Sequence, residues 1–318
     1  MSWRRMISTR IQASDMDKPM LNRRVVGLTL AVLVAAALRG NGDKSLAGAG
    51  HAGKLYRQHQ SLMVYYGDRY DTIPGDASLV IIEDRETAEP FVRRHVESTI
   101  LGYVSIAEVH SGRPFYSRLR SKGVLGAPNP AWPDAYFVDV RSDVWRNLLL
   151  NDIIPSILKN GYQGIFLDTL DSAEALERQD PVKFKGTIAA AADLVRAIRA
   201  AFPSIIIMVN RGYAILPQIP GEFDYLLGES VRTTFNPQTG AYFRRTEQDI
   251  EWQRARMLEA RDRDPSLQLF SLDYWNPKDR AGLAALYAEA RADGFVPYIA
   301  TPDLTQIVPE RLPHERAP

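Results

Sequence analysis

The chain contains no cysteine among its 318 residues, and this absence removes several kinds of chemistry at once. Disulfides, zinc–thiolate sites, iron–sulfur clusters and a thiol nucleophile all need cysteine side chains. The absence does not fix the compartment, because many exported proteins also lack cysteine. Histidine is scarce too, with five residues, and none of them forms a closely spaced metal-binding pair. We therefore expect neither a metal nor a cofactor.

Several sequence motifs of nucleotide-binding proteins and of hydrolases are missing as well. The sequence has no G-x-S-x-G elbow and no Walker-type loop. Residues 48–53 match G-x-G-x-x-G by letter, but no predicted strand precedes them, so the match is interpreted as chance. The formal net charge is +1, which gives no reason to expect nucleic acid or an anionic membrane as a partner. Hydrophobic content of 45% is ordinary for a globular protein with a sizeable core.

The N-terminal region predicts export. Arg23 and Arg24 precede an apolar run at residues 25–38, and small residues follow, including the A-x-A pattern of Ala47 to Ala49. The run is short for a membrane span, which needs about 20 residues. An uncleaved membrane anchor or a buried helix stays open as an alternative. We expect a secreted or periplasmic protein with an export segment and linker at 1–55, a folded domain at 56–305 and a tail at 306–318.

Eight short apolar runs predict the strands of that domain. They are nearly continuous in hydrophobicity, as expected for parallel strands that are covered on both faces. The runs are Leu62–Tyr66, Leu79–Ile82, Ile100–Ile106, Ile165–Leu167, Ile205–Val209, Tyr225–Leu227, Leu267–Leu272 and Phe295–Ile299. A further short piece, Tyr136 to Val138, precedes Asp139.

Helical patterns separate most of these runs, at residues 87–97, 143–159, 184–201, 246–261 and 277–292. Pro155 should kink or split the second of them, and Asn276 is the expected N-cap of the last. Strands that alternate with helices indicate an α/β fold with a parallel sheet. Eight strands in about 250 residues favour a single (β/α)8 TIM barrel over an open doubly wound sheet.

Two long segments, residues 107–134 and 230–245, are rich in glycine, proline and aromatic residues and are predicted to be loops. Both follow predicted strands. They should therefore lie at the carboxyl face, where active sites of such barrels are built. Loops of this length in a compact domain are usually functional.

Acidic and amide side chains follow most of the predicted strands, so one face of the barrel should carry many carboxylates. Any one of these acids could instead be a helix N-cap. Asp168 and Glu229 resist that interpretation, because we expect no helix directly after either of them. The candidates at the strand ends are Asp84, Glu108, Asp139, Asp168, Asp171, Asn210, Glu229 and Asp273.

Two carboxylates that face each other across a groove are the minimal equipment for glycoside hydrolysis. Aromatic residues near the mouth could stack on sugar rings, although each taken alone could equally be packing. They are Tyr66, Tyr103, Trp132, Tyr213, Tyr274, Trp275 and Tyr298. A non-catalytic carbohydrate-binding barrel remains an alternative. An aldolase-like or phosphate-binding barrel is disfavoured, because the predicted strands carry no lysine and no glycine-rich phosphate loop follows the last two.

One stretch of the sequence resembles glycoside hydrolase family 114, the endo-α-1,4-polygalactosaminidase-like barrels. It consists of Trp132 to Val140, a helix containing Trp145, and then Gly161 to Asp168. Ser105-Ile106-Ala107-Glu108 is similar to the family's S-I-G-E. Leu272-Asp273-Tyr274 and the run from Gly294 to Tyr298 resemble its last two strands. The resemblance spans roughly residues 60–305.

This resemblance implies a secreted barrel that cleaves galactosamine-containing exopolysaccharide, with a retaining mechanism. It implies that Asp168 is the nucleophile and that Glu229 is the general acid and base. Substrate-positioning roles are expected for Tyr66, Asp84, Glu108, Asp139, Asp171, Asn210, Asp273, Tyr274 and Tyr298. A partly deacetylated galactosamine polymer is cationic, so an acidic mouth would attract it.

Overall fold

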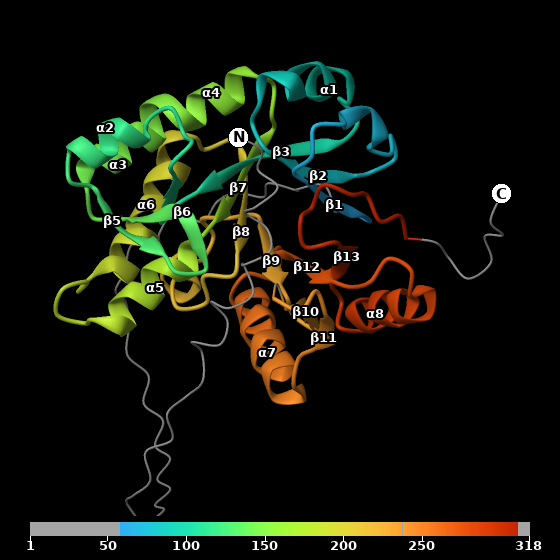
Figure 1. The fold of residues 1–318 in the computed structure, drawn as a ribbon. Coiled ribbons are helices and arrows are strands. Elements are labelled where there is room, and N and C mark those ends of the chain that lie inside the picture. Colours follow the sequence, from blue (N-terminus) through green and yellow to red (C-terminus); the bar gives the residue numbers. More distant parts are fainter. Residues whose placement is uncertain (1–57, 237, 311–318) are drawn as a thin grey trace, which may run out of the picture.

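The computed structural model describes residues 58–236 and 238–310, and its centre is a sheet of eight parallel strands. The first and last strands, β1 and β13, lie against each other, so the sheet curls into a nearly closed barrel (Figure 1). In the order of the sheet, the strands are β1 (Leu62–Tyr65), β2 (Leu79–Ile82), β3 (Thr99–Ser105), β7 (Gly164–Asp168), β8 (Ile206–Asn210), β9 (Tyr225–Glu229), β12 (Gln268–Tyr274) and β13 (Val296–Ala300).

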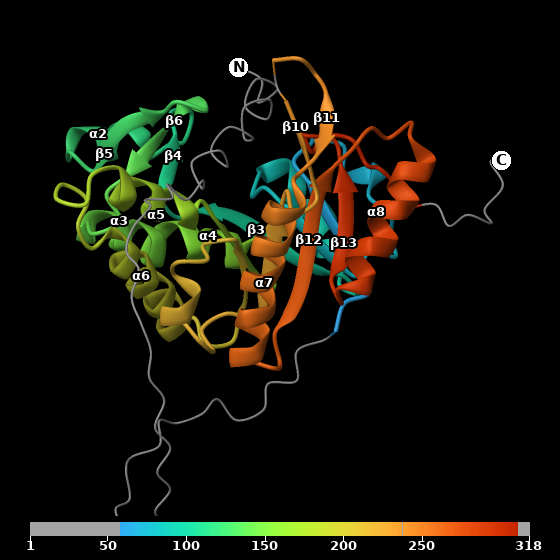
Figure 2. The same cartoon turned by 90° about the horizontal axis from the view of Figure 1, so that it is seen from below.

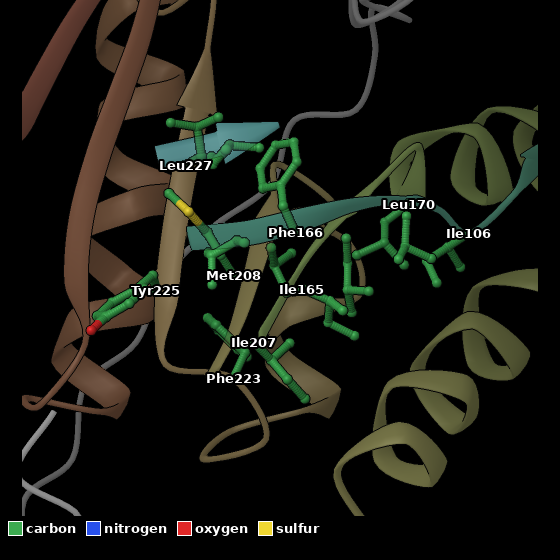
Figure 3. Packing of buried hydrophobic residues seen from close by; sticks show 14 of the residues in the cluster. Ile106, Ile165, Phe166, Leu170, Ile207, Met208, Phe223, Tyr225 and Leu227 are labelled. Carbon is green, nitrogen blue, oxygen red and sulfur yellow. The ribbon is translucent and has the colours of Figure 1, made fainter. Parts of the chain in front are cut away.

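The TIM-barrel prediction is confirmed, and each of the eight predicted apolar runs forms one barrel strand. Parallel pairing places Phe166 beside Met208 and Ile165 beside Ile207. Because side chains alternate along a strand, the first pair lies on one face of the sheet and the second pair on the other (Figure 3). All four are buried, so both faces are covered, as the unbroken hydrophobicity of the strands requires.

Helices pack around the sheet and connect most of its strands. They are α1 (Glu89–Arg94), α3 (Asp143–Leu148), α4 (Ile154–Lys159), α5 (Leu170–Gln179), α6 (Thr187–Ala201), α7 (Glu247–Arg263) and α8 (Arg280–Ala292). Residues 66–78, all of them described, contain only the 3-10 turn Tyr70–Thr72 between β1 and β2. The link from β8 to β9 likewise contains only the 3-10 turn Leu216–Gln218.

Three local predictions about helices have clear outcomes. The predicted 143–159 helix is split, because the π-helical turn Leu149–Ile153 separates α3 from α4 and Pro155 lies in the first turn of α4. The N-cap prediction for α8 was wrong: the side chain of Asp279, not that of Asn276, accepts the backbone N–H of Gly282. The expectation that no helix follows Asp168 directly was also wrong, since α5 begins at Leu170.

The two predicted long loops contain additional secondary structure. The first carries β4 (Glu108–His110), α2 (Tyr116–Ser121), β5 (Leu125–Asn129) and the start of β6 (Trp132–Val138); its strands pair as an antiparallel sheet, here called the inserted sheet. The second carries the hairpin of β10 (Thr233–Phe235) and β11 (Tyr242–Arg244). Both additions lie at the end of the barrel toward which β12 and β13 point (Figure 2).

The predicted export segment and linker at residues 1–55 lie outside the described residues. Among residues 58–236 and 238–310, no helix combines the length and the apolar character that crossing a membrane requires. Of the predicted tail, Val308 is buried and Ile307 packs against the core.

Candidate active site

A cavity of about 1060 Å³ opens at the carboxyl ends of the barrel strands. Its lining runs from the inserted sheet, across β3, β7, β8 and β9, to α7. Acids that follow successive parallel strands meet at one end of the sheet, so the sequence pattern does bring them together. The predicted site residues that line the cavity are Tyr66, Asp84, Glu108, Asp168, Asp171, Asn210 and Glu229.

Asn210 joins the two carboxylates at the floor of this cavity. Its Nδ2 donates to Asp168 Oδ1 over 2.8 Å and to Glu229 Oε2 over 2.7 Å. The two oxygens therefore lie no farther apart than these distances added together, about 5.5 Å. Asp168, Asn210 and Glu229 are 3%, 4% and 7% exposed, so the group is largely removed from water.

Each of the two carboxylates also accepts a hydrogen bond from a tyrosine of its own. Tyr103, on β3, donates its hydroxyl to Asp168 Oδ2 over 2.9 Å. Tyr274, on β12, donates to Glu229 Oε1 over 2.6 Å. Both oxygens of each acid therefore have a donor, which fixes the direction in which each carboxylate points. A tyrosine hydroxyl can accept as well as donate, so the Tyr274 contact can persist when Glu229 is protonated.

The backbone is left-handed at the residue that directly follows each of Asp168, Asn210 and Glu229. Thr169, Arg211 and Ser230 have φ of 65°, 53° and 55°. Within the described ranges, Leu304 (φ 50°) is the one other non-glycine residue of this kind, and all four line the cavity. Such conformations cost of order 1–3 kcal/mol each and persist where the surroundings over-determine them.

Thr169 shows how the surroundings hold one of these turns. Its Oγ1 accepts the backbone N–H of Ala107 over 2.9 Å and that of Ile106 over 3.1 Å, and it shares a hydrogen bond with Ser105 Oγ. The hydroxyl thereby ties the end of β3 to the residue that follows Asp168. The β-branched side chain is thus retained in a conformation that would otherwise favour glycine.

The other acids of the cavity are held by neutral or cationic partners. Glu108 Oε1 accepts from Asn129 Nδ2 over 2.9 Å and from Ser172 Oγ over 2.6 Å, which links the inserted sheet to α5. Asp84 accepts from Asn160 Nδ2 over 2.9 Å. Asp171, in the first turn of α5, forms an ion pair of 3.4 Å with Arg211.

Four predicted site residues lie outside the cavity lining. Asp139 pairs with Arg141, whose hydrogen bond is the main cause of the lowered pKa of Asp139. Tyr298 is buried in the barrel, and its pKa is raised by that burial. Tyr274 is also buried and reaches the site through its contact with Glu229.

Asp273 is the fourth of these residues and is completely buried. Its Oδ1 accepts the backbone N–H groups of Arg232 and Thr233 over 2.7 and 2.9 Å, so it holds the chain just after Glu229. Burial raises the pKa of Asp273 above its ordinary value, and the two backbone hydrogen bonds act in the opposite direction.

Sequence reasoning gave too little weight to several residues of the site. Tyr103 was one of seven aromatic candidates, and only its contact with Asp168 distinguishes it. Thr169, Trp252 and Gln253 were not singled out. Gln253 donates to the backbone oxygen of Glu229 over 3.1 Å, and Trp252 lines the cavity. The predicted 246–261 helix is strongly charged, so its lone tryptophan was the one sequence signal that could have pointed to Trp252 as a site residue.

Over the described part of the chain, no group of three or more histidine or acidic residues is arranged to hold a metal ion.

The sequence pattern of glycoside-hydrolase family GH114 matches residues 45–312. This chain belongs to family GH114. The glycoside hydrolase domain of PelA from Pseudomonas aeruginosa is similar in structure, with 25% identity, a TM-score of 0.68, and coverage of 79% of this chain and 98% of that domain. Aspergillus fumigatus Ega3, solved in complex with galactosamine, shares the fold at 15% identity, with a TM-score of 0.58 and coverage of 81% of this chain and 97% of Ega3.

A further similarity is to a Thermotoga maritima protein described as uncharacterized. It is 23% identical over 217 residues, which are 64% of this chain. The match covers 65% of the length of that curated relative. The family resemblance stated from the sequence is thus confirmed.

Proposed function

We propose that this GH114 protein hydrolyses glycosidic bonds of a galactosamine-containing polysaccharide, with Asp168 as nucleophile and Glu229 as general acid and base. The observation that carries the proposal is the pair of buried carboxylates joined by Asn210 at the floor of the barrel cavity. Two carboxylates on opposite sides of a scissile bond are what glycoside hydrolysis requires.

The separation of the carboxylates supports a retaining mechanism. Retaining enzymes hold the two groups about 5–5.5 Å apart, whereas inverting enzymes need about 6.5–9.5 Å to admit a water between them. The shared contact with Asn210 Nδ2 keeps one oxygen of Asp168 and one of Glu229 within about 5.5 Å of each other, which is short of the range that inversion needs.

The proposed reaction has two steps. Asp168 attacks the anomeric carbon, the bond to the glycosidic oxygen breaks, and Glu229 gives its proton to that oxygen. Glu229 then takes a proton from water, whose oxygen attacks the anomeric carbon and releases Asp168. One water is consumed per bond. Tyr103 and Asn210 hold Asp168 in the ionised, oriented form that the first step needs.

The charge of the cavity supports an amino-sugar substrate. Carboxylates outnumber lysine and arginine side chains two to one in its lining, although the whole chain is nearly neutral. A polymer with free amino groups is cationic and would be concentrated at such a surface. Ega3, which has the same fold, was solved with galactosamine.

We also propose that the protein is exported, with residues 25–38 as the apolar part of the signal. N-terminal sequencing of the protein recovered from its native host would test this. A mature chain that starts shortly after Ala49 supports export with cleavage, and an intact N-terminus in the cytoplasm contradicts it.

Incubation with galactosamine, N-acetylgalactosamine and glucosamine polymers tests the activity, with the new reducing ends as the readout. Asp168→Asn and Glu229→Gln should abolish cleavage, while Asp139→Asn, whose carboxylate lies outside the cavity lining, serves as the matched control. Cleavage by Asp168→Asn at the wild-type rate would refute the assignment. Binding of polymer without cleavage by the wild-type protein would favour a non-catalytic carbohydrate-binding barrel. The anomeric configuration of the first product, measured by NMR, decides between retention and inversion.

A further inference from the structure

Trp252 is an exposed aromatic side chain in the lining of the cavity. It lies on α7, and 41% of it is exposed. The other large hydrophobic side chains that the described residues expose are Val96, Val182 and Phe243, and none of these lines the cavity. A partly exposed indole in the lining of the cavity that holds both proposed catalytic carboxylates is available to contact a ligand.

The indole is held in place by its neighbours. The ring of Tyr213 meets it edge to face, with centroids 5.6 Å apart and planes at 88°. Tyr213 itself is buried and follows the left-handed pair Arg211 and Gly212, which turn the chain after Asn210. The next residue of α7, Gln253, is buried and donates to the backbone oxygen of Glu229, which anchors this turn of α7 to the end of β9. Trp252 is therefore held close to the chain that follows Asn210 and to the end of β9.

The segments of the chain after Glu229 contribute few residues to the cavity lining. Along the chain after Glu229, the lining includes Ser230, Trp252 and Leu304, whereas on the Asp168 side it extends through α5 to the inserted sheet. Trp252 is thus the one aromatic side chain that the described segments after Glu229 contribute to the lining.

We propose that Trp252, supported by Tyr213, is the platform of a sugar-binding subsite on the Glu229 side, and that it stacks on one amino-sugar unit of the polymer. A pyranose ring presents C–H groups on its face, and these make dispersion contacts with an aromatic ring. A free amino group on the sugar is cationic and is attracted by the face of an indole. The proposal rests on the proposed function for the identity of the polymer.

Because the platform lies beside the carboxylates rather than at the reacting bond, it should bind substrate and transition state about equally. Trp252→Ala is then expected to raise KM for long galactosamine oligosaccharides about tenfold and to leave kcat nearly unchanged. Trp252→Phe should recover part of this loss, because it keeps an aromatic face. Phe243→Ala is the matched control, since Phe243 is 44% exposed on β11 and lies outside the cavity lining.

The closing experiment measures cleavage and binding separately. Binding of galactosamine oligosaccharides to the Glu229→Gln protein is followed by calorimetry, with and without Trp252→Ala. Weaker binding and a raised KM in the Trp252→Ala proteins, with Phe243→Ala unchanged, support the subsite. If the wild-type protein binds but does not cleave, and Trp252→Ala weakens binding, the proposed activity fails and the subsite stands. Equal KM and equal binding in Trp252→Ala and Phe243→Ala overturn the subsite, and so does wild-type protein that binds none of these oligosaccharides.

Discussion

Removal of the Asn210 amide should disable the pair of carboxylates without unfolding the barrel. In Asn210→Ala, Asp168 and Glu229 lose the donor that they share. A hydrogen bond to a charged group contributes about 1.5–3 kcal/mol. The proposed reaction needs Asp168 ionised, so this loss falls on the catalytic form and should reduce kcat/KM about 10- to 150-fold.

The pH–rate profile gives a second readout of the same substitution. Asn210 Nδ2 donates to Asp168 and so favours its ionised form, and Asn210→Ala removes that donor. The acid limb of the profile should therefore move to higher pH in Asn210→Ala. Rates would be measured from reducing ends between pH 3 and pH 8, and a urea titration would show that the variant is folded.

Substitution of another asparagine that donates to an acid of the cavity lining provides the matched control. Asn160 Nδ2 donates to Asp84, which lines the same cavity, but not to Asp168 or Glu229. Asn160→Ala should therefore leave the acid limb in place and change kcat/KM by less than Asn210→Ala does. The reasoning fails if Asn210→Ala keeps kcat/KM within about threefold of the wild-type value and its acid limb does not move.

Three further predictions concern stability, each measured as the free energy of unfolding in urea. Thr169→Val should lose about 1–3 kcal/mol because the N–H of Ala107 loses its acceptor, while Thr169→Ser should keep most of the stability; equal losses would contradict this. Burial raises the pKa of Asp273, so the folded state binds the carboxyl proton of Asp273 more tightly than the unfolded state does, and stability falls as pH rises above about 4. Asp273→Asn should remove that part of the dependence of stability on pH, and an unchanged dependence would count against this reasoning. Arg199→Met should cost about 3–5 kcal/mol because it leaves Asp224 buried without its 2.7 Å partner, whereas Arg93→Met, at an exposed pair, should cost less than 1 kcal/mol.

The barrel could be predicted from sequence because its strands are apolar on both faces, and such runs stand out against amphipathic helices. The inserted sheet could not. β5, with the sequence LGAPN, contains glycine and proline, which disfavour strands, and its pairing depends on partners that lie elsewhere in the chain. α5 was missed because it begins two residues after Asp168 without a usual start signal: its N-cap, Thr169, has a left-handed backbone and makes no side-chain cap hydrogen bond.

The carboxylates of the candidate site could be located from sequence, but their surroundings could not. A residue at the end of a strand has a known place in a barrel, which is why Asp168, Asn210 and Glu229 were found. Asp139 has the same local pattern, yet it follows a strand of the inserted sheet and lies outside the cavity lining. Trp252 and Tyr103 enter the site through tertiary contacts, which their local sequence does not predict.

The four left-handed residues at the cavity have a consequence for any attempt to make this protein more heat-resistant. In the described part of the chain, non-glycine backbone strain is confined to the edge of this one cavity. Substitutions that relieve this backbone strain would raise the melting temperature, and they would all lie at residues that line the cavity. A screen for thermostability alone would thus select substitutions next to Asp168, Asn210 and Glu229. Such variants would have a higher melting temperature and a lower catalytic rate.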